Sequence, residues 1–572
     1  MHISRLVTGI ALLFLCTFVQ AALLQSINSV EKERAVYQQA ITRLKLPTAM
    51  TVKDFKQTQQ LLQNYPLKPY FELAYLESKF HQYPVAEVEK FQQQYAGSYI
   101  AFNMQNQWLA YLAKHKQWKL YRQFYTDSGI KGQQCTALLG DLALGDDKAD
   151  IFSQTTQLWL SHKSLPKSCD PLFEKWQQAG YLNTALAWQR FQMAYAANNL
   201  RLAKYLSKKL NSHDRQLALR LLNPQPYKHR WFKDLAAINK DTTLSSGSIK
   251  RLLRKLAATD HQQVSRLVEY AQPPMNNDDL REITKLCAWY YAKNDANKAQ
   301  QWLKNMPGSD DKQLQEFELR FALQAKNWLS YKNVYAQTPD SIQNKPEWLY
   351  WYAIAQLKSG KKSINPDKQP ELILKALAKQ RNFYGFLAAE QNNNSQYSIH
   401  NTATDITLGT QVAAKLAAAF ELYHLGQNRE ANRDWYFITR NFDHQQWQQA
   451  AVLANQQQWY ERSIQAYAKA QLWDMVDARF PLAFAEDFKK HSDIQNIDAS
   501  WLFAMARQES AFSPQARSHV GARGLLQLMP KTAKKVAQSL NMPFNVKKLN
   551  EPSYNITLGS RYLKDLLIKF NN

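Results

Sequence analysis

The sequence has 572 residues and a formal net charge of +25, and 45% of its residues are hydrophobic. This length predicts three or four domains at roughly 150 residues each, and the scarcity of glycine, with 16 residues, beside abundant Gln, Ala, Leu and Lys favours an all-α protein. No apolar run of 18 residues follows the N-terminus, which excludes a membrane span in the mature chain.

Residues 1–21 have the pattern of a secretory signal peptide. Arg5 supplies positive charge, residues 6–19 are mostly apolar, and residues 19–21 offer small side chains for cleavage, in a run too short for a membrane helix. Cys16 follows a bulky residue, so we expect it to leave with the signal peptide rather than to accept a lipid. The segment predicts export to the periplasm, with an uncleaved anchor as the alternative.

Export places the three remaining cysteines in a compartment where disulfides persist. Cys135 and Cys169 are 34 residues apart and fall in loop-like segments, so we predict a disulfide between them. Closing such a loop stabilises a fold by roughly 3–4 kcal/mol. Cys287 lies in the apolar run LCAWYYA and is expected to be a small buried hydrophobic residue.

The excess of positive charge has two interpretations. Lys and Arg bind nucleic acid by displacing condensed counterions, or they bind an anionic polymer outside the cytoplasm. The signal peptide favours the second interpretation, and the basic residues are spread along the chain rather than gathered in one arm. For any single one of them, a solvated surface position is the simpler interpretation.

Residues 22–397 repeat the apolar period of amphipathic helices. One stripe, with Lys and Arg between its members, comprises Ile249, Leu252, Leu253, Leu256 and Ala257. A second stripe follows two prolines and a cluster of Asn and Asp, and comprises Leu280, Ile283, Leu286, Cys287 and Tyr290. These stripes predict a long helical domain.

The predicted turns share a loose signature, a polar pair followed four residues later by alanine. The three instances are Asn198-Asn199 with Ala203, Asn294-Asp295 with Ala299, and Gly426-Gln427 with Ala431. Their spacings of 96 and 132 residues are not a short fixed period, so we predict helical hairpins rather than a clean repeat. The many aromatic residues are expected mainly in the core, and a sugar-binding surface is the alternative.

Two polar breaks divide the rest of the chain. Residues 392–406 are rich in Asn and lack an apolar period, which predicts a domain boundary. Short helices are expected over residues 412–441 and 446–473, within a linker domain of residues 398–480. A second break, at residues 491–498, falls inside a C-terminal domain of residues 481–572.

The chemistry-bearing stretch is residues 501–530. Asp498 is placed to cap a helix that reaches about Glu509, and Pro514 prevents the helix from continuing. The negative end of the helix and apolar walls from Phe512, Leu525 and Met529 would keep the Glu509 carboxyl protonated, as general-acid cleavage of a glycosidic bond requires. An isolated Glu-Ser pair at a helix end is, however, commonplace.

The residues that follow make this interpretation specific. Gly521 and Gly524 permit a tight turn. Gln527 supplies an amide that can both donate to and accept from sugar groups. A helix is expected to resume over residues 532–540, before Asn555-Ile556-Thr557-Leu558-Gly559-Ser560-Arg561-Tyr562-Leu563.

The stretch ARQESAFSPQARSHVGARGLLQLMPKTA resembles the catalytic segment of the soluble lytic transglycosylases of the bacterial periplasm. Glu509-Ser510 matches the first motif of the family, and Gly524-Leu525-Leu526-Gln527 matches its Gly-Leu-Met-Gln motif with Leu for Met. The resemblance extends along the chain and implies an all-α fold, with a long, ring-like α-superhelical domain, a helical linker and a lysozyme-like catalytic domain.

The resemblance also implies function and site residues. It implies cleavage of the MurNAc–GlcNAc bond of peptidoglycan with a 1,6-anhydromuramoyl product, Glu509 being general acid and then base. Ser510, Gly524, Gln527, Met529 and Tyr562 would position the glycan, although Tyr562 is also explained as a core residue. No cofactor is implied, and the histidines do not cluster at metal-ligand spacings. The expected partners are peptidoglycan strands and a cell-wall synthase, and the chain is expected to be a monomer that binds no nucleic acid.

One departure from the family pattern leads to a further expectation. Family members carry an Ala-Tyr-Asn motif beyond this point, whereas this sequence stops at Asn572. We therefore expect a fragment or a truncated product with an incomplete catalytic domain and weak or no activity. A peptidoglycan-binding scaffold is the alternative function, and a nucleic-acid-binding helical repeat is a third class that export would exclude.

Overall fold

The structure is a computed structural model that describes residues 30–46, 50–237, 244–271, 275–293, 295–304, 312–360, 365–392 and 406–570. The predicted signal peptide with Cys16, the turn residue Asn294 and most of the predicted boundary at 392–406 lie outside these ranges. The all-α prediction is confirmed, because the described residues form helices and only isolated β-bridges, which lie between residues 517 and 528. None of the described helices is both long and apolar enough to span a bilayer.

The chain divides by its internal contacts into two units. Unit 1 combines Met1–Tyr111 with His400–Asn572, and unit 2 is Leu112–Ile399. The segment predicted as one superhelical domain, residues 22–397, thus contributes its first part to unit 1. The predicted domain limits remain predictions.

Unit 1 contains helices from both ends of the chain. A helix over residues 30–44 is followed by α2 (Val52–Leu61), α3 (Lys68–Ser78), η1 (Phe80–Gln82), α4 (Val85–Gln94) and α5 (Tyr99–Lys114). The later helices are α23 (Thr410–His424), α24 (Asn428–Thr439), α25 (His444–Gln456), α26 (Tyr460–Lys469), α27 (Val476–Arg479), α28 (Ala485–Gln495), α29 (Ala499–Ser510), α30 (Pro530–Ser539), η7 (Val546–Asn550) and α31 (Pro552–Phe570).

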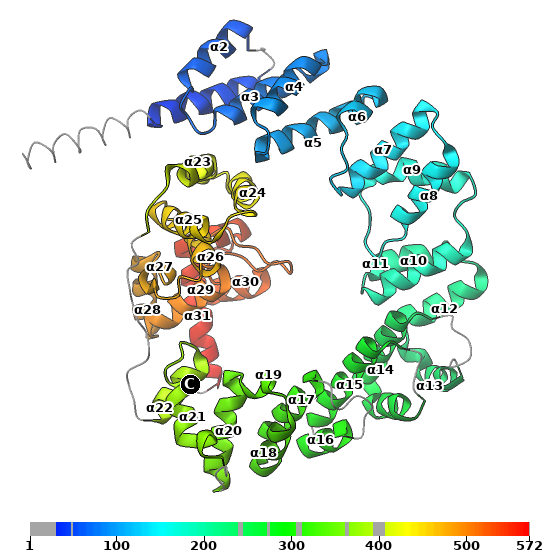
Figure 1. Ribbon diagram of the computed structural model, residues 1–572, viewed down its shortest axis with the longest axis vertical. Coiled ribbons are helices and arrows are strands. Elements are labelled where there is room, and N and C mark those ends of the chain that lie inside the picture. The colour runs from blue at the N-terminus through cyan, green and yellow to red at the C-terminus, as the bar shows by residue number, and fades with distance from the viewer. Residues whose placement is uncertain are drawn as a thin grey trace, which may run out of the picture. The chain divides into compact units, whose positions relative to one another are not determined.

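Unit 2 is a succession of short helices that follow one another along a curved row in Figure 1. They are α6 (Trp118–Phe124), α7 (Lys131–Leu144), α8 (Lys148–Trp159), η2 (Lys167–Cys169), α9 (Asp170–Gln178), α10 (Thr184–Ala196), α11 (Leu200–Ser207), α12 (Ser212–Leu222), η3 (Gln225–Tyr227), α13 (Lys228–Ala237), α14 (Ser246–Arg266), η5 (Leu267–Ala271), α15 (Asn277–Ala292), α16 (Ala296–Lys304), α17 (Lys312–Gln324), α18 (Trp328–Gln337), α19 (Asp340–Gln343), α20 (Pro346–Ser359), η6 (Pro366–Lys368), α21 (Pro370–Leu377) and α22 (Phe383–Gln391).

The predicted core of unit 2 is confirmed. The first apolar stripe lies on α14, and all five of its residues are fully buried. Ile283 and Cys287 of the second stripe are fully buried on α15, and burial raises the pKa of the Cys287 thiol to about 11. Cys135 and Cys169 form the predicted disulfide, which joins α7 to η2 across a Cα–Cα distance of 5.0 Å.

Ten turns in the described part of the chain have the same backbone geometry. At each, one residue in the left-handed region follows a helix, and the next residue donates its N–H to the carbonyl five positions back, as in a Schellman turn. The ten left-handed residues are Lys116, Gly145, Gly180, Asn198, Lys326, Gly426, Gln458, Gln471, Asn496 and Asn541. The predicted turns at residues 198–199 and 426–427 are two of these ten, and Ala203 and Ala431 after them are fully buried, which lets the paired helices approach closely.

The two parts of unit 1 are joined by an ion pair between a buried glutamate and a half-buried arginine. Glu421 on α23 accepts from Arg34 Nε at 2.5 Å, from Arg34 Nη2 at 3.0 Å and from the Tyr65 hydroxyl at 2.7 Å. Burial alone would raise the pKa of the Glu421 carboxyl, but these hydrogen bonds leave it lowered. The contact links residues 387 positions apart in the sequence.

One predicted break is wrong. Residues 491–498 were expected to be a loop, whereas α28 continues through His491 to Gln495. His491 and Ser492 are buried, so the packing of this face sustains the helix despite its polar sequence. The break is limited to Asn496–Asp498 and begins at Asn496, which has a left-handed backbone.

Candidate active site

The candidate acid, Glu509, lies in the last turn of α29. Asp498 caps the start of this helix by accepting from the Ser500 N–H at 2.8 Å, as the sequence predicts. Leu502 and Ala506 face the core, and the helix ends where Ala511 and Phe512 both adopt positive φ. This reversal places Glu509 at the rim of the core.

The expected apolar niche around Glu509 is not formed. The side chain of Glu509 is exposed, and no described residue forms a hydrogen bond or ion pair with it. Phe512, which is 3% exposed, and Leu525 instead belong to the hydrophobic core of this region, because the reversal after α29 turns Phe512 inward. Met529 is 41% exposed. The carboxylate is therefore accessible to a ligand from solvent.

The second motif forms a tight hairpin next to this helix. The isolated bridges pair Arg517 with Arg523 and Arg523 with Leu528. Gln527 has a left-handed backbone, and its Nε2 donates to the carbonyls of Gly524 at 2.9 Å and Ala516 at 3.1 Å. The sequence predicts that the whole Gln527 amide faces the sugar. The structure uses the NH2 group to close the hairpin, which leaves Oε1 as the acceptor without a described partner.

Asn555 on α31 holds the hairpin in place. Its side chain is 1% exposed and makes three hydrogen bonds with backbone groups. Nδ2 donates to the carbonyls of Leu549 at 2.8 Å and Arg523 at 3.1 Å, and Oδ1 accepts from the Leu526 N–H at 2.8 Å. The sequence singled out Asn555 only as part of a pattern, because nothing in one sequence shows which backbone groups a buried amide will meet.

Two glycines make this close approach possible. Gly524 has φ +76°, and a Cβ there would lie 2.1 Å from the Leu549 carbonyl oxygen and 2.2 Å from Asn555 Nδ2. A Cβ on Gly559 of α31 would lie 2.3 Å from Leu526 Cδ1. Any larger residue at either position would push the hairpin away from α31.

The remaining predicted site residues have structural contacts. The Ser510 hydroxyl donates to the Ala506 carbonyl at 2.9 Å within α29. Tyr562 is half-buried and packs against the small cluster that includes Leu528 and Leu549, so its ring supports α31. Glu509, Ser510 and the hairpin are brought into one region, because α29, Leu525 and Leu526 share a hydrophobic cluster.

A pocket of about 460 Å³ lies beside the loop that follows Glu509. The loop residues Phe512 to Ala516 line one side, and the other side is lined by residues of α23, α24 and α26. Glu461 is the acidic residue of this lining, and its carboxylate accepts from Arg462 Nη2 at 3.1 Å. Within the described ranges, no group of three or more His, Cys, Asp or Glu is arranged to hold a metal ion.

Comparison with known proteins relates two segments of the chain, one of which contains Glu509, to one class of enzyme. Residues 486–572 match the family described as "Transglycosylase SLT domain", and residues 411–476 match "Soluble lytic murein transglycosylase L domain". Residues 149–247 also match "Cucumovirus coat protein", a similarity confined to unit 2 and therefore without bearing on this site.

Full-length relatives show the same similarity. The soluble lytic murein transglycosylase of Escherichia coli K12 is 26% identical over 520 residues, which cover 89% of this chain and 79% of that protein. A putative soluble lytic murein transglycosylase of Haemophilus influenzae is 35% identical over 263 residues, covering 45% of this chain and 42% of that protein.

Solved structures extend the comparison to the fold. An inactive mutant of the lytic transglycosylase Slt from Pseudomonas aeruginosa has a TM-score of 0.73 and 29% identity, covering 94% of this chain and 87% of that one. The 70 kDa soluble lytic transglycosylase of Escherichia coli has a TM-score of 0.76 and 24% identity, covering 95% and 88%.

Proposed function

The chain belongs to the soluble lytic murein transglycosylases, and from this membership we propose that it cleaves the MurNAc–GlcNAc bond of peptidoglycan and leaves a 1,6-anhydromuramoyl end. The observation that carries the proposal is the accessible, unpaired carboxylate of Glu509 at the end of α29, next to the hairpin that Asn555 fixes. The proposed location is the periplasm, where the glycan strands and a cell-wall synthase are the proposed partners.

Glu509 acts first as the general acid. A glycan strand that covers the carboxyl group excludes water from it. The proton passes to the glycosidic oxygen as the bond from that oxygen to C1 of the muramoyl residue breaks.

Glu509 then acts as the general base. Its carboxylate takes the proton of the muramoyl C6 hydroxyl, whose oxygen bonds to C1 of the same sugar. No water is consumed, and Glu509 regains a proton in place of the one that it gave to the leaving oxygen. A retaining hydrolase needs a second carboxylate about 5 Å away as nucleophile, but the sugar's own acetamido oxygen fulfils that role here.

The other predicted residues position the strand. Gln527 presents its Oε1 as an acceptor for a sugar hydroxyl or acetamido N–H, because its NH2 group is committed to the hairpin. Met529, which is exposed at the start of α30, supplies an apolar surface for a sugar ring. Ser510 and Tyr562 support α29 and α31 and act through them.

The test compares the parent chain with Glu509→Gln on purified peptidoglycan sacculi. We expect anhydro-muropeptides, measured by mass spectrometry, from the parent and at least a hundredfold less from the variant, as for loss of a general acid. Glu551→Gln is the matched control, because Glu551 is also an exposed acid in this domain. Equal product from Glu509→Gln and the parent would refute the assignment.

A second candidate function is a peptidoglycan-binding scaffold. The exposure of Glu509 favours it, since no described residue covers the carboxyl group. In that case the parent chain would bind sacculi in a sedimentation assay but release no anhydro-muropeptide, and Glu509→Gln would leave binding unchanged. Product release by the parent chain distinguishes the two functions.

A further inference from the structure

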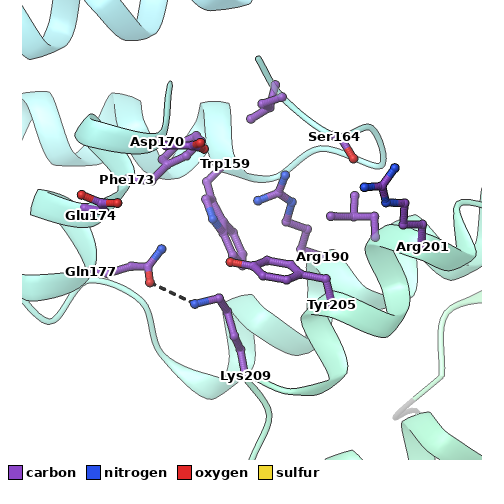
Figure 2. A pocket seen from close by; sticks show the side chains of 12 residues that line it. Trp159, Ser164, Asp170, Phe173, Glu174, Gln177, Arg190, Arg201, Tyr205 and Lys209 are labelled. Carbon is purple, nitrogen blue, oxygen red and sulfur yellow. Dashed lines mark hydrogen bonds between the residues drawn. The ribbon is translucent and has the colours of Figure 1, made fainter. Parts of the chain in front are cut away.

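Unit 2 contains a large pocket whose lining residues are far along the chain from the candidate acid. Its volume is about 790 Å³, within the range of ligand-binding cavities. The end of α8, the loop before η2, and helices α9, α10 and α11 form its walls (Figure 2). No pattern in the sequence groups these segments, and the proposed catalytic reaction uses none of them.

The pocket is built around a buried arginine. Arg190 on α10 is only 5% exposed, and its guanidinium lies 4.5 Å from the centroid of the Trp159 ring. Its Nε and Nη2 donate to the carbonyls of Ser161 at 3.2 Å and Lys163 at 3.5 Å, and no described carboxylate forms an ion pair with it. Burial lowers the pKa of Arg190 to about 10. A buried cation without a counter-ion is costly, and an anionic ligand would remove that cost.

Other side chains extend the cationic side of the pocket. Arg201 on α11 is exposed, and Lys209 just after α11 donates to Gln177 Oε1 at 3.2 Å. The Tyr205 ring is 54% exposed and lies between these cations, with Lys209 Nζ 5.5 Å from its centroid. An exposed aromatic ring flanked by cations is a surface on which a flat or extended ligand can lie.

The opposite side of the pocket is acidic. Asp170 and Glu174, one turn apart on α9, are both exposed and line the pocket. Figure 2 shows them across the Trp159 and Tyr205 rings from Arg190 and Arg201. The pocket therefore has separate sites for negative and positive groups, which a purely anionic polymer such as nucleic acid would not match.

We propose that this pocket binds a short peptide that carries both carboxylates and a free amine. Its carboxylates pair with Arg190 and Arg201, its backbone lies over Tyr205, and its amine pairs with Asp170 and Glu174. The assignment of this peptide to the stem peptide of peptidoglycan rests on the proposed function, while the binding itself does not. The pocket would then hold a peptide-bearing strand through residues that the proposed cleavage does not use.

Isothermal titration calorimetry of the full chain with the tripeptide L-alanyl-γ-D-glutamyl-meso-diaminopimelate tests the proposal. We expect Arg201→Glu to weaken binding at least about tenfold, because a charge-assisted hydrogen bond is replaced by repulsion. Arg215→Glu on α12 is the matched control, since Arg215 is exposed but does not line the pocket, and it should bind as the parent does. Arg190→Lys keeps the positive charge but removes the planar guanidinium, so it tests whether the shape of that group matters for binding. Circular dichroism checks that this variant is folded.

A ligand change separates the two halves of the pocket. Glu174→Lys should weaken the tripeptide but not an analogue that lacks the free amine. No binding of the tripeptide, or equal binding by Arg201→Glu and Arg215→Glu, would overturn the proposal. Failure of the proposed catalysis can be distinguished from failure of peptide binding. Glu509→Gln should bind the tripeptide normally, and the pocket variants should still cleave glycan strands from which the peptides have been removed.

Discussion

Replacing the buried amide of Asn555 should loosen the hairpin that carries Gln527. Asn555→Asp keeps the size of the side chain but points a carboxylate oxygen at the carbonyls of Leu549 and Arg523, where Nδ2 now donates. Each buried acceptor left without a donor costs about 1–3 kcal/mol. Two lost hydrogen bonds and the burial of a charge should therefore destabilise the catalytic region by at least about 3 kcal/mol at neutral pH.

The assay is urea unfolding monitored by circular dichroism, together with anhydro-muropeptide release at a temperature where the variant is folded. We expect a lower unfolding midpoint and a lower kcat, since Gln527 is displaced while Glu509 is untouched. Asn550→Asp is the control, because the Asn550 amide makes its hydrogen bond with Gln515 at the surface. A variant as stable and as active as the control would refute the role given to this amide.

Three further predictions concern stability. Glu421→Gln should lower the free energy of unfolding by about 3 kcal/mol, since it leaves Arg34 without its counter-charge. Faster hydrogen exchange over residues 30–44 would report this loss, and unchanged exchange would contradict it. Burial raises the pKa of Asp434 to about 7, above its unfolded value near 3.9, so its contribution to stability is complete below about pH 4 and is lost as the pH rises through 7. Asp434→Asn should accordingly be more stable than the parent at pH 8, by up to about 4 kcal/mol, and the gain should shrink at pH 5 in denaturant melts. Reducing the Cys135–Cys169 disulfide should lower the stability of unit 2 by about 4 kcal/mol, measured as a shift in its unfolding transition, and no shift would count against the loop-closure argument.

Features encoded by local pattern could be predicted from the sequence. The stripe on α14, the cap at Asp498 and the disulfide each depend on residue type and spacing, and each is present. The repeated hairpin turn was only partly predictable. Its left-handed position is glycine at Gly426 but lysine at Lys116 and Lys326, so residue identity does not mark it.

Features that depend on tertiary contacts could not be predicted. The sequence predicted apolar walls from Phe512, Leu525 and Met529 around Glu509, and so suggested an enclosed carboxyl. The left-handed backbone of Ala511 and Phe512 turns Phe512 into the core instead, and it leaves the acid exposed. The three hydrogen bonds of Asn555 likewise join segments that no local pattern connects.

The pairing of Arg34 with Glu421 has a consequence for how the protein forms. Unit 1 combines an early and a late segment of the chain with unit 2 between them, so during synthesis its first helices emerge long before their partners. Until α23 arrives, the apolar faces of these helices lack the part of their cover that the later helices supply, and they are open to association with other chains. Unit 2, whose contacts are contiguous in sequence, can fold in that interval. The order of emergence thus makes the N-terminal helices the part of the molecule most in need of a chaperone.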